Sequence, residues 1–363
     1  MAIAAALSVP AVALAETANV TLYGVLNMSA DYVTTGDPTN AAAAKGVSKL
    51  VVSSNQSRLG FKGAEDLGGG LSAIWQIESL IGMDNAGGSL GFGRNTFAGL
   101  KSDSMGSVML GRHDTPYFMA TRRLDVFADG IADSRSMTGT GDATSGTAFE
   151  GRQPDSIVYI SPVFSGFTGA FSHANTQETR TAVGSAAGSI NSLAGMYNAG
   201  PIFASLAYET HNVNSGTVGV GETSETATKL GFGYTQDAFS VGVFYETTSD
   251  DFGPAKADRS GHTAIYVGGK YNLASGAVKA AITQAGERGT GAAANNTDAQ
   301  QISLGYDHNL SKRTIAYVSY TSISNGDAVN YGLAGASTGG GAATRNGNGA
   351  DPSAISFGVR HAF

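Results

Sequence analysis

The chain ends with the stretch Ile355-Ser356-Phe357-Gly358-Val359-Arg360-His361-Ala362-Phe363. Its bulky residues recur at every second position, which is the period of a β-strand because successive side chains of a strand point to opposite faces. A strand that ends a chain on an aromatic ring indicates the closing strand of an outer-membrane β-barrel, whose rings lie at the membrane interface. The competing interpretation is the last strand of a soluble sandwich. The two faces are Ile355, Phe357, Val359, His361 and Phe363 on one side, and Ser356, Gly358, Arg360 and Ala362 on the other.

The other end of the sequence is typical of an exported protein. Residues 1–15 are apolar and rich in alanine, and they end in Ala13-Leu14-Ala15, a small-residue cleavage pattern. The basic start of a usual secretory signal is missing. This run is too short to cross a bilayer as a helix, and no other stretch approaches the roughly 18 apolar residues that such a helix needs. We therefore expect 1–15 to be a partial signal peptide and 16–363 to be one exported domain.

The composition restricts the classes of protein further. The chain has 51 Gly, 14 Tyr and 16 Phe but no Cys, so disulfides contribute nothing to its stability. The formal net charge is −7, which argues against nucleic acid as a partner. The even mixture of apolar and polar residues suits a barrel wall, in which lipid-facing and lumen-facing side chains alternate.

Alternation of this kind recurs along the chain and predicts sixteen strands. In 71–79, for example, Leu71, Trp75 and Ile77 share one face while Gln76 and Glu78 point the other way. The clearest predicted strands are 20–32, 57–63, 71–79, 156–161, 167–173, 203–211, 229–235, 239–248, 263–271, 277–283, 301–308, 314–322 and 354–363, with weaker ones near 92–101, 107–112 and 189–197.

The connections between these strands alternate between short turns and long polar loops. The short turns are rich in Gly, Asn, Asp, Ser and Pro, which supply turn dihedral angles. An up-and-down barrel with short periplasmic turns and long outer loops has this pattern, whereas a sandwich or a propeller has no reason to sort loop lengths in this way. The sequence therefore predicts an all-β fold, a sixteen-stranded antiparallel transmembrane β-barrel. The turns are 64–70, 102–106, 162–166, 198–201, 236–238, 272–276 and 311–313.

The segment 113–153 is the longest connection and differs from the other loops. It carries apolar residues such as Tyr117, Phe118 and Phe127 together with charges of both signs. Loops of this length are uncommon unless they are functional or disordered. Because a loop with its own apolar residues packs against a surface, we expect this one to lie on the inside wall of the barrel.

Several motifs, taken in order, resemble the general bacterial porin family, especially the trimeric porins of β-proteobacteria. The resemblance covers essentially all of 20–363. It implies a homotrimer of sixteen-stranded barrels in the bacterial outer membrane, whose third long loop, here 113–153, folds inward as a constriction. It also implies contact with membrane lipid and lipopolysaccharide, and assembly-machinery recognition of the last strand through Phe363. The motifs are Val20–Val25, Ser57–Gly68, Phe97–Leu100, Gly106–Val108, Leu110–Arg112, Val158–Pro162, Gly166-Phe167 and Gly358–Phe363.

The resemblance places three arginines at the constriction, Arg58, Arg94 and Arg152. Arg58 lies opposite in phase to Leu59 and Phe61, so it is expected to face the lumen. Lumen placement is also favoured physically, because a charged side chain at the lipid-facing midplane costs roughly 2–4 kcal/mol. Rings of fixed charge are one way in which pores select ions. The alternative is that these arginines only pair with carboxylates and hold the loop in place.

On the loop, Asp125, Asp129 and Asp133 are spaced four apart, so a short helix places them on one face. Facing the arginines, they create a transverse field across the pore; the alternatives are a solvated acidic face or a fortuitous cation site. Arg122, Arg123 and Arg135 either join the basic side or pair locally, and Tyr23 and Tyr117 are possible pore-lining aromatics. We expect a modest anion preference if the three wall arginines face the pore, and a weak cation preference if the loop carboxylates dominate.

These observations predict a passive diffusion porin for ions and small hydrophilic solutes, with neither an enzymatic activity nor a cofactor. The sequence 87–91 matches the letters of a G-x-S-x-G nucleophile motif, but it lies in a glycine-rich loop followed by a strand rather than a helix. The six histidines show no metal-ligand spacing. Two alternatives stay open: a substrate-specific channel for sugars or organic acids, and a non-conducting binding or adhesive barrel.

Overall fold

The protein was analysed as a computed structural model. The structure describes residues 20–39, 45–84, 90–91, 93–140, 148–175, 188–213, 223–252, 257–289, 295–333 and 344–363. The expected signal segment 1–15 lies outside the described residues, as does most of the 87–91 motif.

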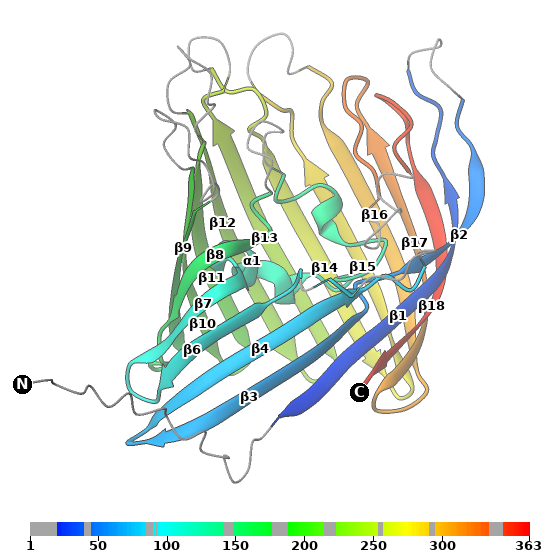
Figure 1. Cartoon of the computed structure of the whole chain (residues 1–363). Coiled ribbons are helices and arrows are strands. Elements are labelled where there is room, and N and C mark those ends of the chain that lie inside the picture. Colours follow the sequence, from blue (N-terminus) through cyan, green and yellow to red (C-terminus); the bar gives the residue numbers. More distant parts are fainter. Residues whose placement is uncertain are drawn as a thin grey trace, which may run out of the picture.

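The described residues form a closed antiparallel barrel of sixteen strands, with the chain between two of its strands folded into the interior (Figure 1). The predicted fold class is therefore confirmed. The strands are β1 (Thr21–Thr34), β2 (Ser48–Ser54), β3 (Arg58–Gly68), β4 (Leu71–Ile81), β5 (Leu90–Gly91), β6 (Thr96–Ser102), β7 (Gly106–Asp114), β8 (Arg152–Ile160), β9 (Phe167–Asn175), β10 (Ser189–Ala199), β11 (Ile202–Val213), β12 (Thr223–Gln236), β13 (Phe239–Asp250), β14 (Thr263–Leu273), β15 (Gly276–Ala285), β16 (Ala299–Asn309), β17 (Thr314–Asn325) and β18 (Ser353–Ala362).

Two of the sixteen barrel strands are interrupted, which accounts for the larger number of strand segments. β2 and β3 pair with successive parts of β1, and the register changes by one residue across a break where Gln56 has a positive φ of 55°. An extra residue in one strand produces such a bulge. β5 and β6 likewise both pair with β4, and the register changes by two residues between them. The predicted strand at 57–63 was therefore too short, and β2 was missed, because its serines and lysine weaken the apolar alternation.

The first and last strands close the barrel. β1 pairs with β18 from Val25 opposite Ala362 to Thr34 opposite Ser353. Gly24 and Phe363 extend this ladder by exchanging backbone hydrogen bonds of 2.9 and 3.1 Å. Closure satisfies the backbone N–H and C=O groups that an open edge leaves unpaired, which is a strict requirement inside a bilayer.

In the last strand, the apolar face lies on the outside of the barrel and the polar face on the inside, as expected for a barrel wall. Ile355, Phe357 and Val359 are 42%, 61% and 48% exposed on the outer wall, whereas Ser356 faces inward and is 1% exposed. The seven short turns join the strand pairs that the sequence predicted, and they lie at one end of the barrel (Figure 1). Within the described residues, no helix has the length and apolar character needed to cross a membrane.

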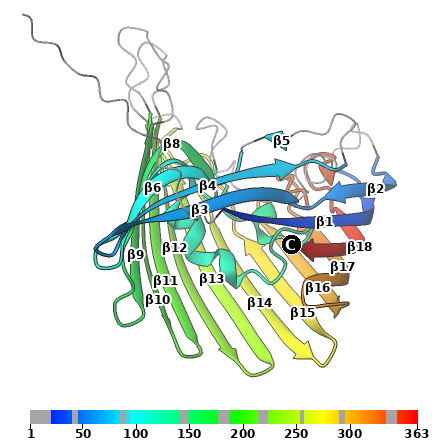
Figure 2. The same cartoon turned by 60° about the horizontal axis from the view of Figure 1, so that its bottom comes forward.

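Much of the apolar core lies inside the barrel, where loops pack against the wall. The connection between β7 and β8 carries α1 (Pro116–Thr121) and the short 3₁₀ helices η1 (Arg122–Leu124) and η2 (Ser134–Ser136), and it crosses the interior (Figure 2). One buried cluster joins Val33 of β1, Ile131 and Met137 of this connection, and Tyr331 and Leu333 of the segment after β17. The connection therefore packs against the wall and against a second inward-folded segment.

Candidate functional site

The connection 115–151, called here the constriction loop, is anchored to the wall at both ends. At its start, α1 directs the fully buried Tyr117 into the wall, where its hydroxyl donates to Oε2 of Glu246 at 2.7 Å. At its end, Glu150 forms an ion pair with Lys229 of β12, and Lys229 also lies 2.8 Å from Glu246. Because a buried charge needs compensating partners, this group holds the loop in one position.

Glycines on the inner wall give the loop its space. A Cβ atom at Gly242 of β13 would lie 2.5 Å from the backbone oxygen of Leu124, and one at Gly231 of β12 would lie 2.9 Å from the Leu124 side chain. A larger residue at Gly242 therefore displaces the backbone of the loop. Leu124 itself is buried against Phe203 and Phe244.

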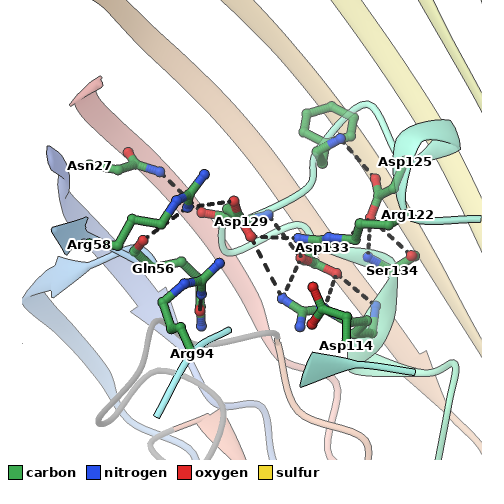
Figure 3. Close-up of polar contacts among 12 residues, drawn as sticks. Asn27, Gln56, Arg58, Arg94, Asp114, Arg122, Asp125, Asp129, Asp133 and Ser134 are labelled. Carbon is green, nitrogen blue, oxygen red and sulfur yellow. Dashed lines mark hydrogen bonds and ion pairs between the residues drawn. The ribbon is translucent and has the colours of Figure 1, made fainter. Parts of the chain in front are cut away.

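The tip of the constriction loop reaches the opposite wall. Oδ2 of Asp129 accepts a hydrogen bond from Nη1 of Arg58 at 3.1 Å, and the backbone oxygen of Asp129 accepts one from Nδ2 of Asn27 at 3.1 Å (Figure 3). Asp129 has a positive φ of 64°, an unusual backbone conformation for a residue other than glycine. The loop therefore narrows the lumen by spanning it.

The predicted helix through Asp125, Asp129 and Asp133 is absent. Oδ1 of Asp125 accepts from the backbone N–H of Phe127 at 2.8 Å, and Oδ2 of Asp133 accepts from that of Asp129 at 2.9 Å. Aspartate side chains that bind backbone N–H groups in this way compete with helical hydrogen bonds. The prediction of a helix was wrong for this reason, although tertiary folding still brings the three carboxylates together.

One arginine joins these three carboxylates. Arg122 lies 2.6 Å from Asp129, 2.8 Å from Asp133 and 3.9 Å from Asp125. Arg135 binds both carboxylate oxygens of Asp133, at 3.1 and 3.0 Å. Both guanidinium groups therefore pair locally.

The three carboxylates differ in their pKa values. Burial opposes the charge of Asp133, but Arg122 and Arg135 hold its pKa well below the ordinary range. Burial also opposes the charge of Asp129, and Arg122 and Arg58 hold its pKa below that range. By contrast, burial and the neighbouring Asp133 charge raise the pKa of Asp125 to about 6. Asp125 is thus the member of this group that changes its charge near neutral pH.

The wall arginines each have an acidic partner. Arg94 forms an ion pair with Glu78 of β4 and donates to Oε1 of Gln56 at 2.8 Å. Arg152, at the start of β8, lies 2.7 Å from Asp114 at the end of β7. The structure therefore brings Arg58, Arg94 and Arg152 to one region of the lumen. Each of them pairs with a carboxylate, which is the alternative role that the sequence left open for these arginines.

The arginines and their partners are not equally exposed. The side chains of Arg58, Arg122 and Arg135 are 18%, 21% and 24% exposed, whereas those of Asp125 and Asp133 are each 2% exposed. Asp129 is an exception at 23%. Two of the three loop carboxylates are therefore turned into the loop, and the arginines present most of the charged surface to the lumen.

The remaining predicted residues lie elsewhere. Tyr117 does not line the pore, because it is fully buried between loop and wall, so that prediction was wrong. Tyr23 is half-buried and donates to Oε2 of Glu78 at 2.9 Å. Arg123 is exposed and donates to Oδ1 of Asn198, near the short-turn end of β10, at 3.1 Å. Phe363 lies at the closure of the barrel.

Sequence reasoning missed several residues of the site. Glu78 carried a signal, because it lies on the lumen phase of its strand, yet its pairing with Arg94 was not predicted. Gln56 and Asn27 had no signal beyond their polarity. Phe118 was noted only as an apolar residue of the loop, but its ring lies 5.7, 5.5 and 5.6 Å from the guanidinium carbons of Arg122, Arg135 and Arg152, respectively.

Two hollows flank the loop, and cations line both. One, of about 180 Å³, lies between the loop tip and the wall and includes Lys279, Asp307 and Arg360. The other, of about 270 Å³, lies beside Arg123 and includes Lys270. Among the described residues, no group of three or more His, Cys, Asp or Glu side chains is arranged to hold a metal ion.

Comparison with known proteins identifies the family. A family model described as Gram-negative porin matches residues 2–328. The chain belongs to the Gram-negative porin family. It is a porin of the outer membrane, and its family consists of channels rather than enzymes.

Individual relatives agree with this assignment. The porin is 29% identical to outer membrane porin protein 32 of Delftia acidovorans, over 95% of this chain and 94% of the relative. It is 28% identical to major outer membrane protein P.IB of Neisseria gonorrhoeae, over 86% and 91% of the two chains. Among solved structures, an anion-selective porin from Comamonas acidovorans is 27% identical and superposes with a TM-score of 0.75, over 96% of this chain and all of that one. OmpT of Vibrio cholerae in its trimer form, at 14% identity, 96% and 100% coverage and a TM-score of 0.70, shares the fold.

Proposed function

We propose that this porin is a passive diffusion channel whose constriction favours small anions over cations. The observation that carries the proposal is the unequal exposure of the charged groups: Arg58 of β3 and Arg122 and Arg135 of the loop keep a surface toward the lumen, while Asp125 and Asp133 are buried. Fixed charges that line a narrow pore select the ions of opposite sign. The relative named as anion-selective, at 27% identity, supports this direction.

The opposite selectivity requires the loop carboxylates to dominate the lumen. Asp129 is exposed, but it lies between Arg58 and Arg122 at 3.1 and 2.6 Å, so its charge is offset on two sides. Asp125 is shielded and shares its neighbour Arg122 with Asp133. We therefore place cation preference second.

We also propose that the functional unit is a homotrimer. Large apolar side chains lie exposed on the outside of neighbouring strands, including Leu22, Leu50, Val52 and Phe357, at 55%, 69%, 61% and 61%. Outer-membrane lipid, including lipopolysaccharide, covers the part of the wall that other subunits leave free.

β18, with Phe363, is the proposed contact of the barrel-assembly machinery. Residues 1–15 are the proposed removed signal and 16–363 the mature domain, without catalytic role or cofactor.

The test is single-channel conductance in a planar bilayer, with the reversal potential measured under a KCl gradient. We expect openings in groups of three and a reversal potential of the sign produced by chloride permeation. Replacement of Arg58, Arg94 and Arg152 by glutamine is expected to move the reversal potential toward zero. A reversal potential of cation sign would overturn the proposed selectivity, and folded protein that never conducts would favour a binding barrel. Saturable block by a sugar or an organic acid would indicate a substrate-specific channel.

A further inference from the structure

One aromatic ring lies among three arginines that come from three parts of the chain. Phe118 is on α1, and the guanidinium carbons of Arg122, Arg135 and Arg152 lie 5.7, 5.5 and 5.6 Å from the centre of its ring. Arg122 begins η1, Arg135 lies in η2 and Arg152 begins β8. All three distances are within the roughly 6 Å over which a cation is attracted to the face of an aromatic ring.

The helix directs this ring to its place. The hydroxyl oxygen of Thr115 caps α1 by accepting from the backbone N–H of Phe118 at 3.3 Å. Adjacent residues on a helix point in different directions, so Tyr117 enters the wall toward Glu246 while Phe118 turns to the arginines. The first turn of the loop thus anchors the loop with one side chain and contacts the pore charges with the next.

We propose that Phe118 is a positioning residue that gathers Arg122, Arg135 and Arg152 into one cationic surface without neutralising it. Like charges repel, so three guanidinium groups meeting at one point need an attractive partner. A carboxylate there would cancel one positive charge, whereas the negative face of a neutral ring attracts the cations and leaves the net charge of the group unchanged.

The partners on the other side of each arginine complete this arrangement. Asp133 lies beside Arg122 and Arg135 at 2.8 and 3.0 Å, and Asp114 lies 2.7 Å from Arg152. Each guanidinium is therefore held between an acid and the same ring. Phe118 is only 4% exposed, so passing solutes touch the arginines and not the ring.

The inference rests on the proposed anion preference. It adds Phe118 as the residue that positions the three guanidinium groups at the constriction. It predicts that selectivity depends on the electron density of the ring and not only on its volume. Fluorination weakens the negative face of a phenylalanine ring in steps while changing its size little, so it separates the two contributions.

The experiment places mono-, di- and trifluorophenylalanine at position 118 and measures the reversal potential of each folded channel under a KCl gradient. Phe118→Leu removes the ring, and Phe118→Tyr restores it. We expect the chloride-over-potassium permeability ratio to fall stepwise with fluorination, to fall roughly two-fold in F118L, and to recover in F118Y. The same fluorinated residues at Phe149, a buried ring of the same loop that stacks on His211 at 4.3 Å, are expected to leave the ratio unchanged.

Each outcome decides the question. A permeability ratio that is the same across the fluorinated series would overturn the inference even if wild-type channels prefer anions. If F118L does not fold, the fluorinated channels still decide, because their packing is nearly native. A wild-type channel without anion preference overturns the proposed selectivity, and a stepwise shift toward potassium with fluorination would still support the positioning role.

Discussion

At the scale of single residues, the constriction is an arrangement of paired charges in which the pairs are unequal. Asp133 is buried and fixed by two arginines, Asp129 links the loop to the wall, and Asp125 has a pKa raised to about 6 by burial and by the Asp133 charge. A carboxyl with a raised pKa takes up a proton as the pH falls through that value. The loop therefore loses one negative charge, at Asp125, between pH 7 and pH 5.

We therefore predict that the anion preference increases as the pH is lowered from 7.5 to 5. The increase should be modest, below about two-fold, because salt screens a single shielded charge. Asp129 and Asp133 stay ionised in this window, since arginines hold their pKa values below the ordinary range. Reversal potentials of wild type and Asp125→Asn over this range test the idea, and the variant should lose the dependence. A pH shift that persists in Asp125→Asn would assign the titration to another group.

At the scale of elements, the position of the constriction loop depends on the wall that it packs against. Small residues on β12 and β13 leave room for Leu124, and the buried Lys229 joins Glu150 of the loop to Glu246 of β13. Close packing of Leu124 on the wall thereby fixes the loop near its start, and the Lys229 ion pairs fix it near its end.

Replacing Gly242 with alanine is expected to push the loop into the lumen. The new Cβ would lie 2.5 Å from the backbone oxygen of Leu124, and backbone cannot rotate away as a side chain can. Single-channel conductance should fall. Gly195→Ala is the matched control, because a Cβ there meets no atom within 4 Å. Equal conductance in the two variants would show that the loop does not rest on this glycine.

Lys229→Met is expected to destabilise the folded barrel by about 3–5 kcal/mol, because it leaves two buried carboxylates without their cation. Thermal unfolding in detergent, followed by gel mobility, measures this loss. Lys279→Met is the matched control, since Lys279 is partly exposed and forms an ion pair with Asp307 at 2.9 Å, so its loss should be smaller. A larger loss in the control would contradict the anchoring role of Lys229.

At the scale of the whole molecule, the formal net charge is opposite in sign to the charge that we propose for the pore. The chain carries a formal net charge of −7, yet arginines present most of the charged surface at the constriction. The net charge of the chain and the charge at the constriction can differ because the barrel wall divides an outer surface from a narrow lumen. Only the charges on the lumen side act on a passing ion.

Selectivity that comes from fixed charges should weaken as salt increases. The screening length is about 10 Å at 0.1 M and about 3 Å at 1 M salt. We predict that the chloride-over-potassium permeability ratio falls toward the ratio of free mobilities when the same KCl gradient ratio is applied at tenfold higher concentration. A ratio that stays constant over this range would indicate a filter that works by direct coordination or size instead.

The barrel could be predicted from local features of the amino-acid sequence. Two-residue alternation, turn residues at regular intervals and one long loop with both apolar and charged residues are local properties, and a closed wall between lipid and water is the architecture that satisfies all of them. Local patterns also predicted that Arg58 faces the lumen, and in the structure Arg58 pairs with Asp129 of the constriction loop. They failed at β2, where serines interrupt the alternation, and at 125–133, where aspartates bind backbone N–H groups in place of a helix.

The pairing of the charged groups, by contrast, depends on how the chain folds in three dimensions. Arg122 with three aspartates, Arg94 with Glu78 and Phe118 with three arginines are contacts within one small region of the lumen. Arg94 is 16 residues from Glu78, and Arg122 meets Asp129 and Asp133 without a helix between them, so no helical or strand spacing in the sequence predicts these contacts. The burial of Tyr117 likewise depends on how the loop lies against β12 and β13. Periodicity fixes the face on which a side chain lies, but the partner and the exposure of a charge depend on the surfaces that folding brings opposite it.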